Sequence, residues 1–182
     1  MLPVEIGTLS VLPLTTLILS KNHLSSLPKE FGTLTSLNKL SLEVNAFTEF
    51  PAAVLSLTQL KSLDLSHNKI KTVPKEITKL QKLTDLLLFA NDLRRLPDEI
   101  VQLKALVHLD VQCNFLKSLP HGLLGRQGLI LDADPEAMNQ VLVTKKPAVG
   151  RKRPQSSVAD GDDDEDGGER KKKSGRTKSK RS

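Results

Sequence analysis

The chain has 182 residues and a formal net charge of +6, with one cysteine and neither tryptophan nor tyrosine. Residues 144–182 carry 13 Lys and Arg against 7 Asp and Glu, so the excess positive charge lies entirely in this segment. The rest of the chain is therefore not a basic nucleic-acid-binding domain, and a single cysteine excludes an intrachain disulfide.

Residues 2–9 come first, and their sequence LPVEIGTL resembles the second half of five later segments. Those segments follow the pattern LxxLxLxxNxLxxLPxxxxxL, with other apolar residues at some leucine positions. They start 23 residues apart, at Leu14, Leu37, Leu60, Leu83 and Leu106. A fixed period of this length indicates a stacked-repeat architecture.

Each part of the repeat predicts a local structure. Alternation in LxL places both leucines on one face of a short strand, and the residues beside them on the other face. The asparagine ends the strand, because its amide can satisfy backbone groups that the turn frees. The proline suits the first turn of a short helix or 3-10 helix, where its missing N–H costs nothing. Apolar residues three apart, such as Ile77 and Leu80, then pack against the strands.

This pattern resembles the cytosolic leucine-rich repeat family, in the 23-residue form found in Ras-pathway scaffolds and plant Ras-group repeat proteins. The resemblance covers roughly residues 2–131. It implies an α/β fold, namely a curved solenoid with a parallel sheet on its concave side. Short helices or 3-10 segments would cover the convex side. The resemblance implies nothing specific about the partner.

The N-terminal end departs from the repeat. Residues 2–9 are a return half with no strand before them. Leu9, Leu12 and Leu14 belong to columns that a preceding strand normally covers. We therefore expect self-association or fraying at this open end, and a truncated form is its simplest origin.

The C-terminal end of the array also departs from it. Arg126 occupies a leucine column, and one more step of the period places Asp132 and Asp134 at strand-leucine positions. A repeat array needs polar terminal repeats to close its core. We therefore expect a solenoid over residues 1–143, with five full repeats, a half repeat at the start and a degenerate C-terminal cap.

Residues 144–182 are rich in Lys, Arg, Gly, Ser and Asp, which predicts a disordered charged tail. Two basic clusters resemble nuclear-import signals, namely Arg151-Lys152-Arg153 and Arg170-Lys171-Lys172-Lys173. Ser156 is a candidate phosphorylation site, because arginines stand five and three residues before it, a spacing that basic-directed kinases favour. Phosphate there would mask the first cluster. The alternative is a solvated polyampholyte that only aids solubility. Without a signal peptide or a membrane-length apolar stretch, we expect an intracellular protein, in the cytoplasm and/or nucleus.

The sequence offers little chemistry. The acidic run from Asp160 fails as a calcium loop, because Glu165 stands where glycine is needed. Cys113 lacks a histidine in reach, since His67 lies two repeats away, about 10 Å at strand spacing. The four histidines show no metal-ligand spacing. We expect no enzymatic activity, no cofactor and no metal.

The concave face is the expected binding surface. Leu87 and Phe89 are large apolar residues on a face that should meet water, and aspartates surround them. An apolar centre with a charged rim is typical of a protein interface, although stray apolar residues also occur on such faces. The predicted partner-binding residues are Asp64, Asp85, Leu87, Phe89, Asp110 and Gln112.

Two functions follow. In the first, the chain is a non-enzymatic interaction module or scaffold that binds a basic protein segment on its concave face. Its basic tail then directs localisation through an import receptor. In the alternative, the chain is a nuclear nucleic-acid-associated protein whose tail contacts phosphates. The tail has no aromatic residues for base stacking, and its acidic run would compete with phosphate.

Overall fold

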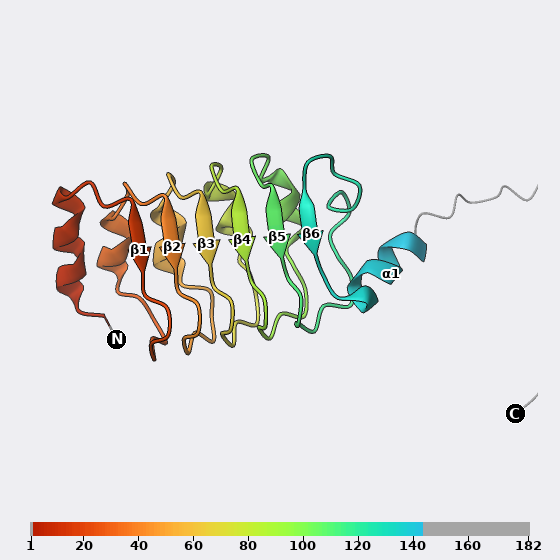
Figure 1. Ribbon diagram of the computed structural model, residues 1–182, viewed down its shortest axis with the longest axis horizontal. Coiled ribbons are helices and arrows are strands. Elements are labelled where there is room, and N and C mark those ends of the chain that lie inside the picture. The colour runs from red at the N-terminus through yellow and green to blue at the C-terminus, as the bar shows by residue number, and fades with distance from the viewer. Residues whose placement is uncertain (1, 144–182) are drawn as a thin grey trace, which may run out of the picture. The chain divides into compact units, whose positions relative to one another are not determined.

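Six three-residue strands stack in chain order into one open parallel sheet (Figure 1). The computed structural model describes residues 2–143, so the predicted tail, its basic clusters and Ser156 lie outside the described residues. The strands are β1 (Thr16–Ile18), β2 (Lys39–Ser41), β3 (Ser62–Asp64), β4 (Asp85–Leu87), β5 (His108–Asp110) and β6 (Ile130–Asp132).

Short 3-10 helices form a second layer on one side of this sheet (Figure 1). They are η1 (Val4–Val11), η2 (Lys29–Thr33), η3 (Ala52–Ser56), η4 (Lys75–Lys79) and η5 (Asp98–Gln102). In η4 the Ile77 N–H donates to the Pro74 carbonyl at 3.1 Å, and the Leu80 N–H donates to the Ile77 carbonyl at 3.0 Å. The predicted return segments are therefore 3-10 rather than α-helical, because five residues suffice to reach the next strand.

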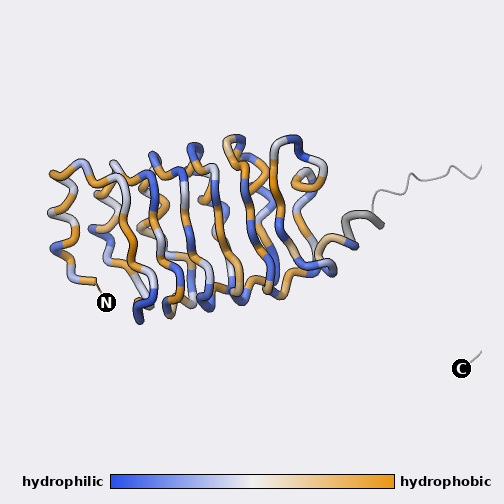
Figure 2. The backbone as a smooth tube through the Cα atoms, in the orientation of Figure 1, coloured by the Kyte–Doolittle hydropathy of each residue, from blue (hydrophilic) through white to orange (hydrophobic). Residues whose placement is uncertain are grey.

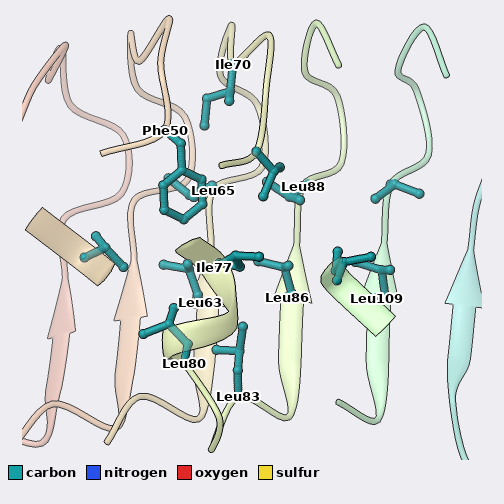
Figure 3. Close-up of a cluster of buried hydrophobic side chains, with 14 of the residues drawn as sticks. Phe50, Leu63, Leu65, Ile70, Ile77, Leu80, Leu83, Leu86, Leu88 and Leu109 are labelled. Atoms are coloured by element: carbon teal, nitrogen blue, oxygen red, sulfur yellow. The ribbon is translucent and has the colours of Figure 1, made fainter. Parts of the chain in front are cut away.

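The core lies between these two layers, and apolar positions recur in each turn along the chain (Figure 2). The two strand-leucine columns face the 3-10 helices, as the alternation predicted (Figure 3). Leu63, Leu65, Leu86 and Leu88 are each 0% exposed. The other face of the sheet, away from the 3-10 helices, corresponds to the predicted concave face and is called the open face below.

The asparagines form a ladder along one end of the strands. Asn91 donates its Nδ2 hydrogens to the carbonyls of Leu65 (3.0 Å), Leu88 (3.1 Å) and Phe89 (3.4 Å). Its Oδ1 accepts the Ile70 N–H at 3.0 Å, so one side chain joins two successive repeats. Asn68 and Asn114 donate in the same way. This confirms the predicted role of the asparagine.

The residue before each ladder asparagine adopts a left-handed backbone. The five residues are Lys21, Val44, His67, Ala90 and Cys113, with φ between 53° and 59°. Positive φ is unusual for a non-glycine residue and most unusual for β-branched valine. The adjacent ladder supplies the hydrogen bonds that hold this turn, for example His67 N–H to the Phe89 carbonyl at 2.8 Å.

The sixth strand corrects the sequence alignment at the C-terminal end. Asp132 was predicted at a strand-leucine position, but β5 pairs Leu109 with Leu131 and Asp110 with Asp132. The return segment is one residue shorter here, and no 3-10 helix forms within it. Three glycines with positive φ, Gly122, Gly125 and Gly128, allow this tighter path. Asp132 therefore lies on the open face.

A helix that the sequence did not reveal, α1 (Pro135–Val143), follows the last strand. Ala137 is buried on the core, so the start of α1 forms part of the expected cap. Asp134, also predicted at a leucine position, precedes the helix. Its carboxylate accepts the N–H groups of Cys113 (3.0 Å) and Asn114 (3.2 Å). A side chain thus replaces the carbonyl that a further strand would supply.

At the other end, β1 is an edge strand and its core positions are incompletely covered. Leu14 and Leu17 are half-buried, whereas their equivalents in the next repeat, Leu37 and Leu40, are 0% exposed. Leu12 is 53% exposed. Leu12 and Leu14 are therefore incompletely covered, as predicted. The self-association that this suggests remains a prediction. No helix among residues 2–143 is long and apolar enough to cross a membrane.

Candidate functional site

The parallel register brings the predicted binding residues together on the open face. Asp64 pairs with Leu87, and Leu87 pairs with Asp110, so these three form one row across β3, β4 and β5. Adjacent strands lie about 4.8 Å apart. Asp85 pairs with His108 at the start of the same two strands, and Phe89 lies just beyond the end of β4.

The apolar centre of this row is less exposed than predicted. Leu87 and Phe89 are half-buried rather than fully wet. Phe89 packs against the His67 ring in an edge-to-face contact, with centroids 5.1 Å apart and an interplanar angle of 68°. Such aromatic pairs are favourable and fix the ring position. The pair therefore forms a partly preformed apolar surface between two turns.

Two serines of the same face correct the prediction that all its side chains meet water. Ser41 is 8% exposed and Ser66 is 7% exposed. A serine side chain is too short to reach past its neighbours across the sheet. Ser41 Oγ lies 2.6 Å from Ser20 Oγ, so the hydroxyl finds a partner in the preceding repeat. Neither serine offers a contact to a large partner.

The aspartates are held by local hydrogen bonds. Asp64 Oδ1 accepts the Ser66 N–H at 2.9 Å, and Asp110 Oδ1 accepts the Gln112 N–H at 3.0 Å. Asp85 Oδ2 accepts the Thr84 hydroxyl at 2.6 Å. Each carboxylate has lost part of its freedom before a partner arrives, which reduces the entropy cost of binding.

The structure places a further carboxylate, that of Asp132, on the open face. The sequence had predicted it at a strand-leucine position. Asp132 Oδ2 lies 2.9 Å from His108 Nε2, and Asp132 also stands beside Asp110 in the sheet register. The acidic row therefore extends onto β6. The signal in the sequence was the LxLD-like run Leu129–Asp132, which repeats the pattern of Leu106–Asp110 after one deletion.

Burial raises the pKa of the Asp110 carboxyl, and the nearby charges of Asp132 and Asp134 raise it further. The hydrogen bond from the Gln112 N–H and the charge of His108 act in the opposite direction. A raised pKa means that Asp110 is more costly to ionise in the folded chain than in the unfolded chain. A positive charge placed beside Asp110 would therefore favour the ionised form of its carboxyl on the open face.

We expect Asp110→Asn to stabilise the free protein slightly at neutral pH, by less than about 1 kcal/mol because solvent screens the site. The folded chain binds the Asp110 proton more tightly, so the cost of ionisation builds as pH rises from the unfolded pKa through the raised folded pKa. The gain should be complete above the folded value and vanish below the unfolded one. Thermal unfolding of both chains between pH 3 and 7 measures it, and an equal gain at both ends would contradict the assignment.

The other candidate residues of the described part of the chain lie outside this row. No group of three or more His, Cys, Asp or Glu residues that could hold a metal occurs among residues 2–143. Cys113 is exposed in its left-handed turn, with its N–H bonded to Asp134. Asp92 and Phe115, which follow successive ladder asparagines, lie in the turns beyond the strand ends rather than on the open face.

Comparison with known proteins agrees with this fold. The family model described as "Leucine rich repeat" matches residues 12–70 and 35–93. No curated protein matches the chain significantly. A leucine-rich repeat protein of Leptospira interrogans is similar in structure, with 40% sequence identity and a TM-score of 0.69 over 78% of this chain and 37% of that protein.

Two plant receptors are similar as well. The ectodomain of the Arabidopsis thaliana receptor kinase GASSHO1/SCHENGEN3 has 27% identity and a TM-score of 0.64, over 72% of this chain and 16% of that one. The plant peptide hormone receptor RGFR1 has 33% identity and a TM-score of 0.60, over 68% of this chain and 21% of that one. This chain thus spans 16–37% of the length of these three structures.

The period, the single row of parallel strands and the asparagine ladder define a repeat solenoid that presents one sheet face. The chain belongs to the leucine-rich repeat family. This class of fold is generally a non-enzymatic module for binding other proteins.

Proposed function

We propose that this chain is a scaffold or interaction module whose open face binds a basic protein segment. The central observation is the row Asp64–Leu87–Asp110, in which an apolar side chain stands between two carboxylates on adjacent strands. A lysine or arginine can lay its methylene stem on the apolar residue while its charge meets a flanking carboxylate.

The surrounding residues support an extended rather than a compact ligand. Phe89, packed on His67, continues the apolar surface along β4, and Asp85 and Gln112 border it. A strand-length segment lying across β3–β5 would contact this row without entering a deep cavity. The similar receptor RGFR1 is described in complex with RGF2 and as a peptide hormone receptor, which agrees with a peptide-like ligand.

Electrostatics adds to this choice of partner. Asp110 is costly to ionise because of burial and the nearby Asp132. A lysine or arginine of the partner would interact favourably with the carboxylates of both Asp110 and Asp132. The acidic row would also speed the approach of a basic partner and repel an acidic one. We place the localisation role in residues 151–153 and 170–173, on sequence grounds alone.

An affinity pull-down tests the proposal. The intact chain and a Leu87→Ala/Phe89→Ala chain are compared as baits, and captured proteins are identified by mass. We expect the double variant to lose captured proteins that carry Lys- and Arg-rich segments, because each large interface side chain typically contributes about 1–4 kcal/mol.

A matched control is Val11→Ala/Leu12→Ala, which removes exposed apolar side chains from the N-terminal end. It should retain the same captured proteins as the intact chain. Equal capture by the Leu87/Phe89 variant and the intact chain would rule out the open face as the binding surface.

A further inference from the structure

A second charged surface lies in the turns between the ladder asparagines and the prolines of the third, fourth and fifth repeats. Its members are all exposed basic residues, and we call them the basic edge: Lys69, Lys71, Arg94, Arg95 and Lys117. Asp92 is the one acidic residue in these turns. Within residues 2–143, the ion pairs are Lys29–Glu30 and His108–Asp132, and neither involves the basic edge.

Backbone hydrogen bonds stack these turns in register. The Lys69 N–H donates to the Phe47 carbonyl at 2.8 Å, and the Asp92 N–H donates to the Ile70 carbonyl at 3.0 Å. The Phe115 N–H continues the series to the Leu93 carbonyl at 2.8 Å. Equivalent side chains of successive turns therefore repeat at about the strand spacing of 4.8 Å, and the cations form a row rather than a scatter.

One hollow in this row combines charge with an apolar surface. Arg94 and Lys117 occupy the same position in successive turns, and with Phe115 they line a hollow of about 260 Å³. Phe115 is 64% exposed, although it is the largest apolar side chain in these turns. An exposed ring that shares a hollow with two cations, neither of which has an ion-pair partner within residues 2–143, is suited to a ligand that carries both acidic and apolar groups.

The basic edge and the open face have opposite charges. The open face carries Asp64, Asp85 and Asp110 over the same repeats, and Asp132 on the next strand. A ligand that fits one surface is therefore repelled by the other, and the two surfaces must recruit different partners.

We propose that the basic edge binds an acidic peptide segment of a partner protein, extended across the three turns. Its Asp or Glu carboxylates would contact Arg94 and Lys117, and an apolar residue would lie on Phe115. This second binding surface lies outside the one assigned to the open face and does not depend on it.

The size and composition of the basic edge favour a peptide over nucleic acid. Three turns span about 10 Å, which equals three or four residues of extended chain. Single-stranded nucleic-acid sites usually extend over about 4–16 nucleotides and stack successive bases on several aromatic rings. Among residues 2–143, the turns of the basic edge offer Phe115 alone. The carboxylate of Asp92 within the row would also oppose a continuous phosphate backbone.

Fluorescence anisotropy with a labelled oligoglutamate peptide that carries one phenylalanine tests this surface. The full chain is compared with Arg94→Gln/Lys117→Gln, in which both side chains are exposed and the fold should be retained. We expect the dissociation constant to rise about tenfold at low salt. Circular dichroism melting of both chains checks the fold directly.

The control variant Lys29→Gln/Lys79→Gln removes the same charge from η2 and η4, and it should leave the affinity within about twofold. Residues 144–182 are identical in all these chains, so their charge cannot produce the difference. Leu87→Ala/Phe89→Ala should also leave peptide binding unchanged, which separates this surface from the open face. Equal losses in the basic-edge and control variants would overturn the proposal. So would an oligouridine RNA that binds more tightly than the peptide and loses affinity only in the basic-edge variant.

Discussion

Replacing Leu86 with aspartate is expected to unfold the solenoid or leave it only marginally folded. Leu86 is 0% exposed in the core column between Leu63 and Leu109. The substitution removes a packed side chain and buries an unpaired carboxylate, which together cost about 5 kcal/mol or more. That is comparable to the whole stability of a typical domain, about 5–15 kcal/mol. Urea unfolding followed by circular dichroism measures the loss.

Leu87→Asp is the matched control, one residue along the same strand. Leu87 is half-buried on the open face between Asp64 and Asp110. Its replacement loses some apolar contact and adds like-charge repulsion across the sheet, which together cost about 1–2 kcal/mol. If the two variants unfold equally readily, the assignment of core and open faces is wrong.

Replacing Asn91 with alanine is expected to cost about 2–4 kcal/mol. Asn91 is 4% exposed, and its amide bonds the carbonyls of Leu65 and Leu88 and the N–H of Ile70. Removing the amide leaves the Ile70 N–H without its acceptor. The Leu65 and Leu88 carbonyls each lose one of two donors and keep the bonds from Asn68 and Asn114. The loss should appear as a lower urea midpoint in equilibrium unfolding.

Asn22 provides an internal control at the same position of the first repeat. It is exposed, and among residues 2–143 it donates to the carbonyls of Leu19 and Ser20 only and its oxygen accepts no backbone N–H. Asn22→Ala should therefore cost less than about 1 kcal/mol. An Asn22 variant as unstable as the Asn91 variant would show that the amide ladder is not the source of the stability.

The sequence predicted the fold well at positions where the same residue type has the same structural role in successive repeats. The leucine columns, the strand phase around Leu63 and Leu86, and the return segments after the first four repeat prolines were confirmed, because burial and backbone bonding demand the same residues in each turn. Periodicity is a strong signal when several copies agree. Proline at the start of a five-residue return segment likewise left few alternatives to a 3-10 helix.

The sequence did not predict the structure at positions where the 23-residue period is broken. Strand β6 and the open-face position of Asp132 were missed, because a one-residue deletion in the glycine-containing return segment between β5 and β6 shifts the alignment. The left-handed turns at Val44 and His67 were also not predicted. Positive φ is uncommon for any non-glycine residue and most unusual for a β-branched valine, and the tertiary hydrogen bonds of the ladder impose it.

The candidate site was predicted in part. The row Asp64–Leu87–Asp110 follows from register, and a fixed period gives register directly. Partial burial of Leu87 and the packing of Phe89 on His67 depend on the sizes of neighbouring side chains. An alignment of the repeats does not show how these side chains pack. The ion pair between His108 and Asp132 could not be predicted without knowing the position of β6.

The most direct test of the central claim is a nuclear magnetic resonance titration of the isotope-labelled full chain with an unlabelled Lys- and Arg-rich peptide. The account predicts that the amide shifts concentrate in β3, β4 and β5, around Asp64, Leu87 and Asp110, and that Leu87→Ala/Phe89→Ala removes them. Shifts confined to the 3-10 helices or to residues outside the sheet would contradict a binding site on the open face.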